Sequence, residues 1–192
     1  MEDLQPGDIG FGPIGGVVGF FVGLGQLVLR DESRFRHVFV IVDDPSLAPP
    51  VAVEAMPSGA RLVSVAERWN ESHVFVRLAA YPVEQRVDIA RHALAMVGTP
   101  YGFSDYLALA LRRLGLKTPL LDRWISRTNQ MGYPVRAICS QLADFAMTRA
   151  GIKVFRDGRL SQNVIPGALF YQLLRIGGVD MWPEPEPSLD HQ

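Results

Sequence analysis

Residues 136–145 read RAICSQLADF and contain the only cysteine of the 192-residue chain, Cys139. Leu142 and Ala146 follow it at helical spacing and Gly151 is placed to end a helix, so Cys139 is expected in the first turn. The unpaired N–H groups and the positive end of the helix dipole stabilise a thiolate at such a position. A buried structural cysteine is the alternative, because free cysteines are among the most buried residues.

The composition indicates one globular domain. Hydrophobic residues make up 48% of the chain, and 19 basic side chains nearly balance 20 acidic ones, which gives a net charge of −1. Such a chain can bury a core. We expect a single domain over residues 1–180 and a flexible tail, rich in proline and glutamate, over residues 181–192. The charge balance gives no reason to expect nucleic acid as a partner, because nucleic-acid binders carry a basic excess or stripe.

The single cysteine excludes an intramolecular disulfide and a zinc site built from several cysteines. It is compatible with a reducing compartment, and equally with a thiol that stays free because its chemistry is needed. We therefore expect no metal and no cofactor.

The run over residues 9–29 is uncharged and about long enough to cross a bilayer. It contains Pro13 and several glycines, which favour a buried helix over residues 14–30, with membrane contact or contact with a partner protein as alternatives. The acidic N-terminus lacks the basic start of a secretory signal. We expect no signal peptide, and so a protein that is cytoplasmic or is carried within a virion or secretion machine.

Apolar segments rich in β-branched residues predict four strands in the first half of the chain. They cover residues 37–42, 51–56, 61–65 and 73–78, after a shorter strand that follows the turn at residues 6–8. The connections between them are short, and short connections fit an antiparallel sheet.

The second half of the chain has the periodicity of helices. The first helix ends at Gly98, and we expect one apolar face of it to pack on the core: Val83, Val87, Ala90, Leu94 and Val97. Further helices are predicted over residues 103–115, 119–127 and 166–175, besides the one that begins at Cys139. Strands early and helices late make an α+β chain, in which a small antiparallel sheet or half-barrel packs against helices.

A cysteine nucleophile needs a base to accept its proton and a third polar group to orient that base. Of the four histidines, His92 falls in the middle of a helix and His191 in the tail. His37 and His73 both open strands, so position alone leaves two candidates for the base.

Glu54 interrupts the otherwise apolar strand over residues 51–56. If that strand pairs antiparallel with residues 37–42, Glu54 comes close to His37. A buried glutamate needs a partner, and an imidazolium is a suitable one. In the alternative, Glu54 is exposed at the strand end and His37 bonds to the backbone.

Five motifs together resemble the circularly permuted branch of the NlpC-type cell-wall peptidases. This papain-like superfamily also includes relatives of lecithin:retinol acyltransferase. In the unpermuted branch the cysteine helix comes first, whereas here the histidine and the glutamate precede the cysteine. The resemblance covers roughly residues 4–175, and its motifs are Leu4–Phe11, Arg36–Val42, Val53–Ala55 with Ser58–Leu62, Gly98–Tyr101 and Cys139–Leu142.

The resemblance implies a role for several side chains. Cys139 would be the nucleophile, His37 the general base and Glu54 the residue that orients it. Tyr101 would lie near the cleft and bind substrate, although an ordinary aromatic residue in a turn before a helix is an equal alternative. Asp8 would be structural, within a turn, and the backbone N–H of Cys139 would contribute to the oxyanion hole.

The chain also departs from the family pattern. Phe39 stands where the histidine motif usually has a glycine, and a bulky side chain there narrows or reshapes the cleft. The segment Pro166–Leu169 lacks the acid usually found near the last helix, and the insertion between Tyr101 and Cys139 is long. These differences concern the substrate more than the fold.

The activity implied by the resemblance is that of a cysteine peptidase or amidase in a permuted papain-like fold. Peptide crosslinks of bacterial peptidoglycan are the first expectation for its substrate, with lipid amides or esters as the second. Without a signal peptide, delivery by a phage tail or a similar machine fits a cell-wall enzyme. The alternative to an enzyme is an inert papain-like module with a binding or assembly role, for which residues 9–29 would provide the contact surface.

Overall fold

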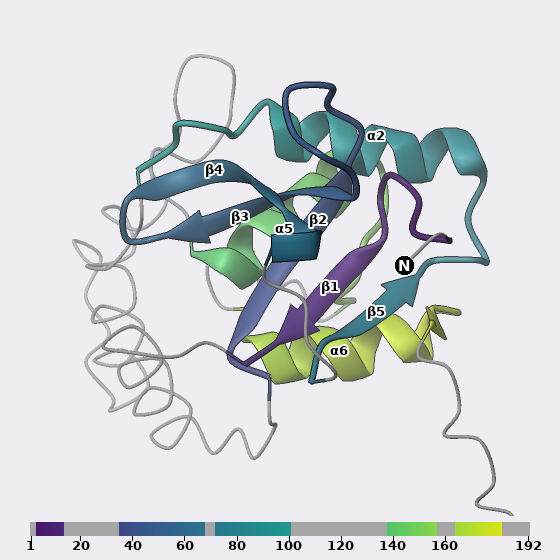
Figure 1. Ribbon diagram of the computed structural model, residues 1–192. Coiled ribbons are helices and arrows are strands. Elements are labelled where there is room, and N and C mark those ends of the chain that lie inside the picture. The colour runs from purple at the N-terminus through teal and green to yellow at the C-terminus, as the bar shows by residue number, and fades with distance from the viewer. Residues whose placement is uncertain (1–2, 14–34, 68–71, 101–137, 157–163, 182–192) are drawn as a thin grey trace, which may run out of the picture.

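The computed structural model describes residues 3–13, 35–67, 72–100, 138–156 and 164–181, and in this part of the chain six strands form one sheet (Figure 1). The strand order is β4-β3-β2-β1-β5-β6, and all neighbours pair antiparallel. The strands are β1 Ile9–Gly12, β2 His37–Val42, β3 Val51–Met56, β4 Gly59–Ser64, β5 Val74–Arg77 and β6 Val179–Asp180. The helices are α2 Val83–Leu94, α5 Cys139–Arg149 and α6 Pro166–Arg175, with a short 3₁₀ helix η1 at Val65–Glu67.

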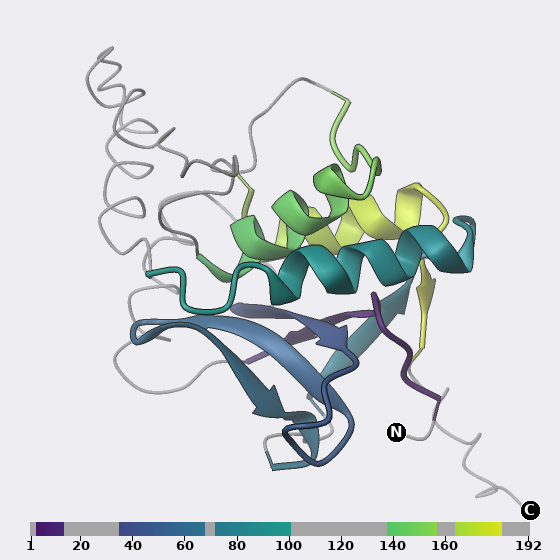
Figure 2. The ribbon, with the colours of Figure 1, turned by 90° about the horizontal axis from the view of Figure 1, so that it is seen from above.

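The three α-helices of the described residues cover one face of the sheet, as the view from above shows (Figure 2). Side chains from these helices and from one face of the strands form the main core, with Ile9, Val40, Val53, Leu142 and Leu169 among its members. A smaller cluster covers the opposite face: Phe39, Ile41, Ala52, Val65 and Phe75. The described residues therefore form an α+β fold with an antiparallel sheet, as the sequence predicted.

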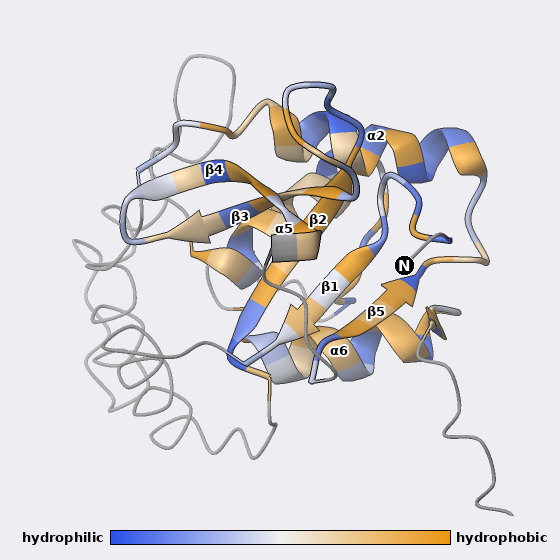
Figure 3. Ribbon diagram, in the orientation of Figure 1, coloured by the Kyte–Doolittle hydropathy of each residue, from blue (hydrophilic) through white to orange (hydrophobic). Residues whose placement is uncertain are grey.

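Strand β2 is buried along its whole length because the sheet is covered on both faces here. Val38 and Val40 belong to the main core, whereas Phe39 and Ile41 belong to the smaller cluster. A strand that is buried on both faces is apolar at nearly every position, and Figure 3 shows β2 mostly in the hydrophobic colours. The continuous apolar runs therefore predicted β2 and β3 with their correct bounds.

The hairpin between β3 and β4 has a two-residue connection, with Met56 opposite Gly59. Strand β4 consequently begins two residues before the predicted segment 61–65. Gly59 has a positive φ of 110°, a conformation in which a side chain is strained. Strand β5 is one residue shorter at each end than the predicted segment 73–78.

Helix α5 begins at Cys139, as the sequence predicted. Ile138 is the N-cap residue in extended conformation, and its backbone N–H donates to the side-chain oxygen of Gln141 at 3.1 Å. Gly151 follows the helix with φ of 81°, the left-handed conformation typical of a helix end. The helix that begins at Pro166 is likewise confirmed as α6.

The predicted core face of α2 is confirmed only in part, because Ala90 is buried and Leu94 packs against the main core, but the three valines do not. Val83, Val87 and Val97 are 56%, 37% and 42% exposed. The buried stripe of the helix shares Ala90 with the predicted face and is completed by Arg86, Ile89 and Ala93. Alanines let a neighbouring helix approach closely, and Ala90 and Ala93 lie in the same core as α5. The valines formed a regular apolar pattern, but the smaller side chains face the core.

Asp8 is completely buried and holds the N-terminal turn together. Its carboxylate accepts a hydrogen bond from the Gln5 N–H at 2.8 Å and two from the Arg77 guanidinium, at 2.9 and 2.6 Å. A buried carboxylate is tolerated when it is paired in this way. Asp8 therefore ties the turn at residues 5–8 to strand β5.

Several predictions fall outside the described residues. These are the helices over residues 14–30, 103–115 and 119–127, and nearly all of the tail over residues 181–192. Within the described part of the chain, none of the helices has both the length and the apolar character that a membrane span requires.

Candidate active site

Cys139 is the first residue of α5 and His37 the first residue of β2, and the thiol lies near enough to the imidazole to raise its pKa. Both residues are buried, at 2% and 6% exposure. Because β2 and α5 are held in place by the main core, the thiol and the imidazole are set in position by two rigid elements. The structure therefore brings together the nucleophile and the base that the sequence predicted.

Glu54 completes the constellation from strand β3. Its Oε2 lies 2.8 Å from Nε2 of His37, and the residue is 2% exposed. In the register of the two strands Glu54 stands opposite Phe39, so it is diagonal to His37 on the same face of the sheet. The alternative of an exposed Glu54 at a strand end is thus excluded.

The surroundings of His37 set its charge state. Burial acts to lower the pKa of His37, but the hydrogen bonds to Cys139 and Glu54, with the charges of these two residues, outweigh it. Together they raise the pKa from 6.5 to about 9. An imidazolium is therefore favoured at neutral pH, held between an acid on one side and a thiol on the other.

Arg61 is a further member of the site that sequence reasoning did not assign to it. Its Nε and one terminal nitrogen donate to Oε1 of Glu54 at 3.0 and 2.8 Å. Arg61 is the cross-strand partner of Glu54 in the β3–β4 hairpin. The two-residue turn at Pro57 and Ser58 was the available signal, because it places residues 54 and 61 opposite each other.

The start of α5 also provides hydrogen-bond donors. A helix leaves its first four N–H groups without partners in the helix, and these carry the positive end of its dipole. The Ile138 N–H is bound by Gln141. The Cys139 N–H comes next along the chain, in the same residue as the thiol.

Phe39 is buried, and its ring packs against residues of neighbouring strands. Its ring lies over Gly10 of β1, where an added Cβ would come within 2.1 Å of it. The rings of His37, His73 and Phe75 surround it at centroid distances of 6.1, 5.9 and 5.8 Å. The glycine in β1 thus makes room for the bulky residue in β2, and Phe39 is 6% exposed.

His73, the second candidate base, lies on the other side of β1. Its ring covers Gly12, and Gly12 is in turn the Cα partner of His37. The histidine whose pKa the Cys139 thiol raises is His37, which favours His37 over His73 as the candidate base. His92 lies on α2, where burial, then the charge of Arg149, lowers its pKa.

Tyr101 lies outside the described residues. The two residues Gly98 and Thr99 are described, and both are hydrogen-bonded to Ala60. The Ala60 N–H donates to the Thr99 carbonyl and the Gly98 N–H to the Ala60 carbonyl, both at 2.8 Å. Residues 98 and 99 are therefore held against Ala60, at the start of strand β4.

The start of α6 is tied to the start of α5 by a hydrogen bond rather than by an acid. The Ser140 hydroxyl, completely buried, donates to the Val164 carbonyl at 2.7 Å. The segment Pro166–Leu169, which lacks the acid of the family pattern, forms the first turn of α6.

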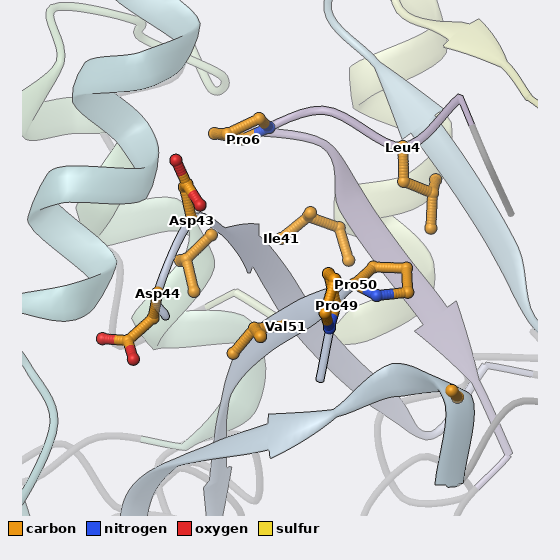
Figure 4. Close-up of a pocket in the computed structure, with 10 residues that line it drawn as sticks. Leu4, Pro6, Ile41, Asp43, Asp44, Pro49, Pro50 and Val51 are labelled. Atoms are coloured by element: carbon orange, nitrogen blue, oxygen red, sulfur yellow. The ribbon is translucent and has the colours of Figure 1, made fainter. Parts of the chain in front are cut away.

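A groove of about 520 Å³ lies at the other end of β2 (Figure 4). Apolar side chains make up most of its walls, among them Pro6, Ile41 and Pro50, and Asp43 and Asp44 add two carboxylates. No lining residue belongs to the constellation of Cys139, so this groove is separate from the candidate active site.

No group of three or more His, Cys, Asp or Glu side chains in the described ranges could hold a metal ion. No protein-family model and no curated protein matches the chain. Among solved structures it is similar to the metalloprotein YiiX from Escherichia coli O157:H7, described as DUF1105, with 20% identity and a TM-score of 0.41. The match covers 72% of this chain and 91% of that one. A likeness of this size carries no argument about function.

Proposed function

We propose that the protein is a cysteine hydrolase of the circularly permuted, NlpC-type papain-like class. The observation that carries the proposal is the 2.8 Å hydrogen bond of His37 to Glu54, with the thiol of Cys139, at the start of α5, raising the pKa of the same imidazole. The order of these residues along the chain, with the cysteine last, supports the permuted form of the fold.

In the proposed reaction His37 already holds the proton as an imidazolium, paired with the thiolate of Cys139, and Sγ attacks the carbonyl carbon of an amide or ester. Glu54 holds Nε2 of His37, which leaves Nδ1 for proton transfer. The carbonyl oxygen becomes an oxyanion, which the Cys139 N–H stabilises at the start of α5. When the bond to the leaving group breaks, His37 donates the proton to that group, and a thioester remains on Sγ.

Water completes the proposed cycle. His37 removes a proton from a water molecule while the water oxygen attacks the thioester carbon. The carbon–sulfur bond then breaks, the carboxylic acid product leaves, and the proton on His37 restores the starting state of the pair. The high pKa of His37 supports its role as the acid in the first half of the cycle.

Peptide crosslinks of bacterial peptidoglycan are the proposed substrate, and lipid amides or esters the second class. This choice follows from the motifs alone, together with delivery by a phage tail or a similar machine. The side chain of Phe39, packed over Gly10 beside His37, is the feature of the site that distinguishes it from the family pattern.

The test has two parts. Iodoacetamide, a neutral thiol reagent, should alkylate Cys139 at pH 7 faster than it alkylates a free cysteine peptide. The full chain should also release peptide fragments and new amines from purified peptidoglycan, and the Cys139→Ala variant should not. Alkylation no faster than that of the free peptide would contradict the hydrolase proposal. Fast alkylation without peptidoglycan cleavage would leave the thiol chemistry in place and reject this substrate.

A further inference from the structure

The carboxylate of Glu54 is held from both sides. Oε2 lies against His37, and Oε1 accepts two hydrogen bonds from the guanidinium of Arg61. We infer that Arg61 is a positioning residue of the site, which fixes the carboxylate of Glu54 and keeps it ionised, and which acts on His37 and Cys139 only through it. This inference rests on the proposed function and adds a residue to its machinery.

The geometry of the contact fixes the orientation of the acid. Two guanidinium nitrogens, at 3.0 and 2.8 Å, bind the same oxygen, so rotation of the carboxylate would break both bonds. The other oxygen is then directed at His37, at 2.8 Å. A lysine would supply a charge at this place but not the planar pair of donors.

The backbone places Arg61 for this role. Glu54 and Arg61 are cross-strand partners, so their side chains leave the same face of the sheet directly opposite each other. Ala60, the preceding residue, is hydrogen-bonded on both its N–H and its carbonyl to the segment at residues 98–99. The base of the Arg61 side chain is therefore fixed by two neighbouring segments.

The difference in burial explains what the charge of Arg61 contributes. The side chain of Glu54 is 3% exposed, whereas that of Arg61 is 41% exposed. An isolated carboxylate at so buried a position would favour its protonated form. Arg61 brings a positive charge from the surface to this acid without the full cost of burying a second ion. An ionised Glu54 is then available to the imidazolium of His37.

The inference is tested with Arg61→Met and Arg61→Lys in the full chain. In Arg61→Met we expect alkylation of Cys139 by iodoacetamide to slow about tenfold, and the acid limb of its pH profile to move to higher pH, because Glu54 loses the cation that keeps it ionised. In Arg61→Lys we expect a slower reaction with an unmoved acid limb. The control is Arg91→Met, since Arg91 pairs with Asp88 on the surface of α2, away from the site.

A readout without Cys139 separates this inference from the proposed function. Carbon-13 NMR follows the titration of the Glu54 carboxyl directly, and its pKa should rise in Arg61→Met but not in Arg61→Lys or Arg91→Met. Unchanged alkylation and an unchanged carboxyl titration in Arg61→Met would overturn the inference, even with a reactive thiol. If the wild-type thiol proves unreactive, the hydrolase proposal fails, and the carboxyl titration alone decides the role of Arg61. Thermal unfolding of each variant shows that a slower reaction does not come from a lost fold.

Discussion

The two ends of strand β2 place acidic side chains in opposite surroundings. At the His37 end, Glu54 is 2% exposed and bound by His37 and Arg61. At the Val42 end, Asp43 and Asp44 lie along a groove, and Asp44 accepts a hydrogen bond from the Ser46 N–H at 2.9 Å. Both ends of β2 have acidic side chains nearby, but only Glu54, at the His37 end, is buried.

The contrast shows which acid is expected to do chemistry. An exposed aspartate is stabilised by solvent and by local turn bonds, as the lowered pKa of Asp44 beside Ser46 illustrates. A buried carboxylate stays ionised only where hydrogen-bond donors or positive charges stabilise it, as His37 and Arg61 do for Glu54. Substitutions at the two ends of β2 therefore test whether the constellation works as a unit.

The largest effect is expected from His37→Gln. Without the base, hydrolysis should fall by about 10³-fold or more, the loss seen when a triad member is removed, and alkylation of Cys139 should slow to the rate of an ordinary thiol. His92→Gln on α2 is the matched control, since His92 is only half-buried and lies outside the site. Equal rates for the wild type and His37→Gln would show that His37 does not act on the thiol.

The next effect is expected from Glu54→Gln, which keeps the size of the side chain but removes its charge. We expect alkylation to slow about 100-fold, and the free energy of unfolding to drop by about 2 kcal/mol, because the neutral amide offers only one acceptor oxygen to the two cationic partners. Urea denaturation measures the second quantity. Asp44→Asn at the other end of β2 serves as the control and should leave both quantities unchanged. Similar losses of rate and stability in Glu54→Gln and Asp44→Asn would contradict a special role for the buried acid.

The sequence predicted the His37 end well for a physical reason. Strand β3 is apolar at every other position, so its one polar residue, Glu54, is conspicuous. Cys139 was located by the helix that begins at it and ends before Gly151. Each of these signals is local, and each requires only the residues next to it in the chain.

Signals that depend on tertiary packing were missed. The valines of α2 made a regular apolar face, but which face is buried depends on how closely α5 can approach, and Ala90 and Ala93 decide that. Arg61 lies among ordinary strand residues, and its role emerges only from the register of the hairpin. The permuted papain-like arrangement and the role of Tyr101 stay predictions.

A smaller effect is expected from crowding the site through Gly10→Ala. The new methyl group would meet the ring of Phe39 at 2.1 Å, so the ring must shift beside His37. We expect the variant to lose about 1–3 kcal/mol of stability by overpacking and to be alkylated several-fold more slowly. Gly151→Ala, strained by a φ of 81° at the far end of α5, should lose stability without slower alkylation. An unaffected rate in Gly10→Ala would show that Phe39 does not support His37.

The smallest effect is expected at the groove. The double variant Asp43→Asn with Asp44→Asn removes both of its carboxylates and should change neither the rate of Cys139 alkylation nor peptidoglycan cleavage. The same reactions used for His37→Gln provide the measurement. A loss of cleavage with intact alkylation would instead assign the groove to substrate binding.

The titration of the His37 imidazole by nitrogen-15 NMR tests the central claim most directly. In the wild type we expect a pKa of about 9, since the hydrogen bonds to Cys139 and Glu54 outweigh the burial that would lower it. The imidazolium, and with it protonation of the leaving group, should therefore be lost as the pH rises through 9. In Cys139→Ala the pKa of His37 should fall, because burial lowers it and only the contribution of Glu54 then remains to raise it. A titration near 6.5 that is the same in both proteins would contradict the coupling of thiol, imidazole and carboxylate.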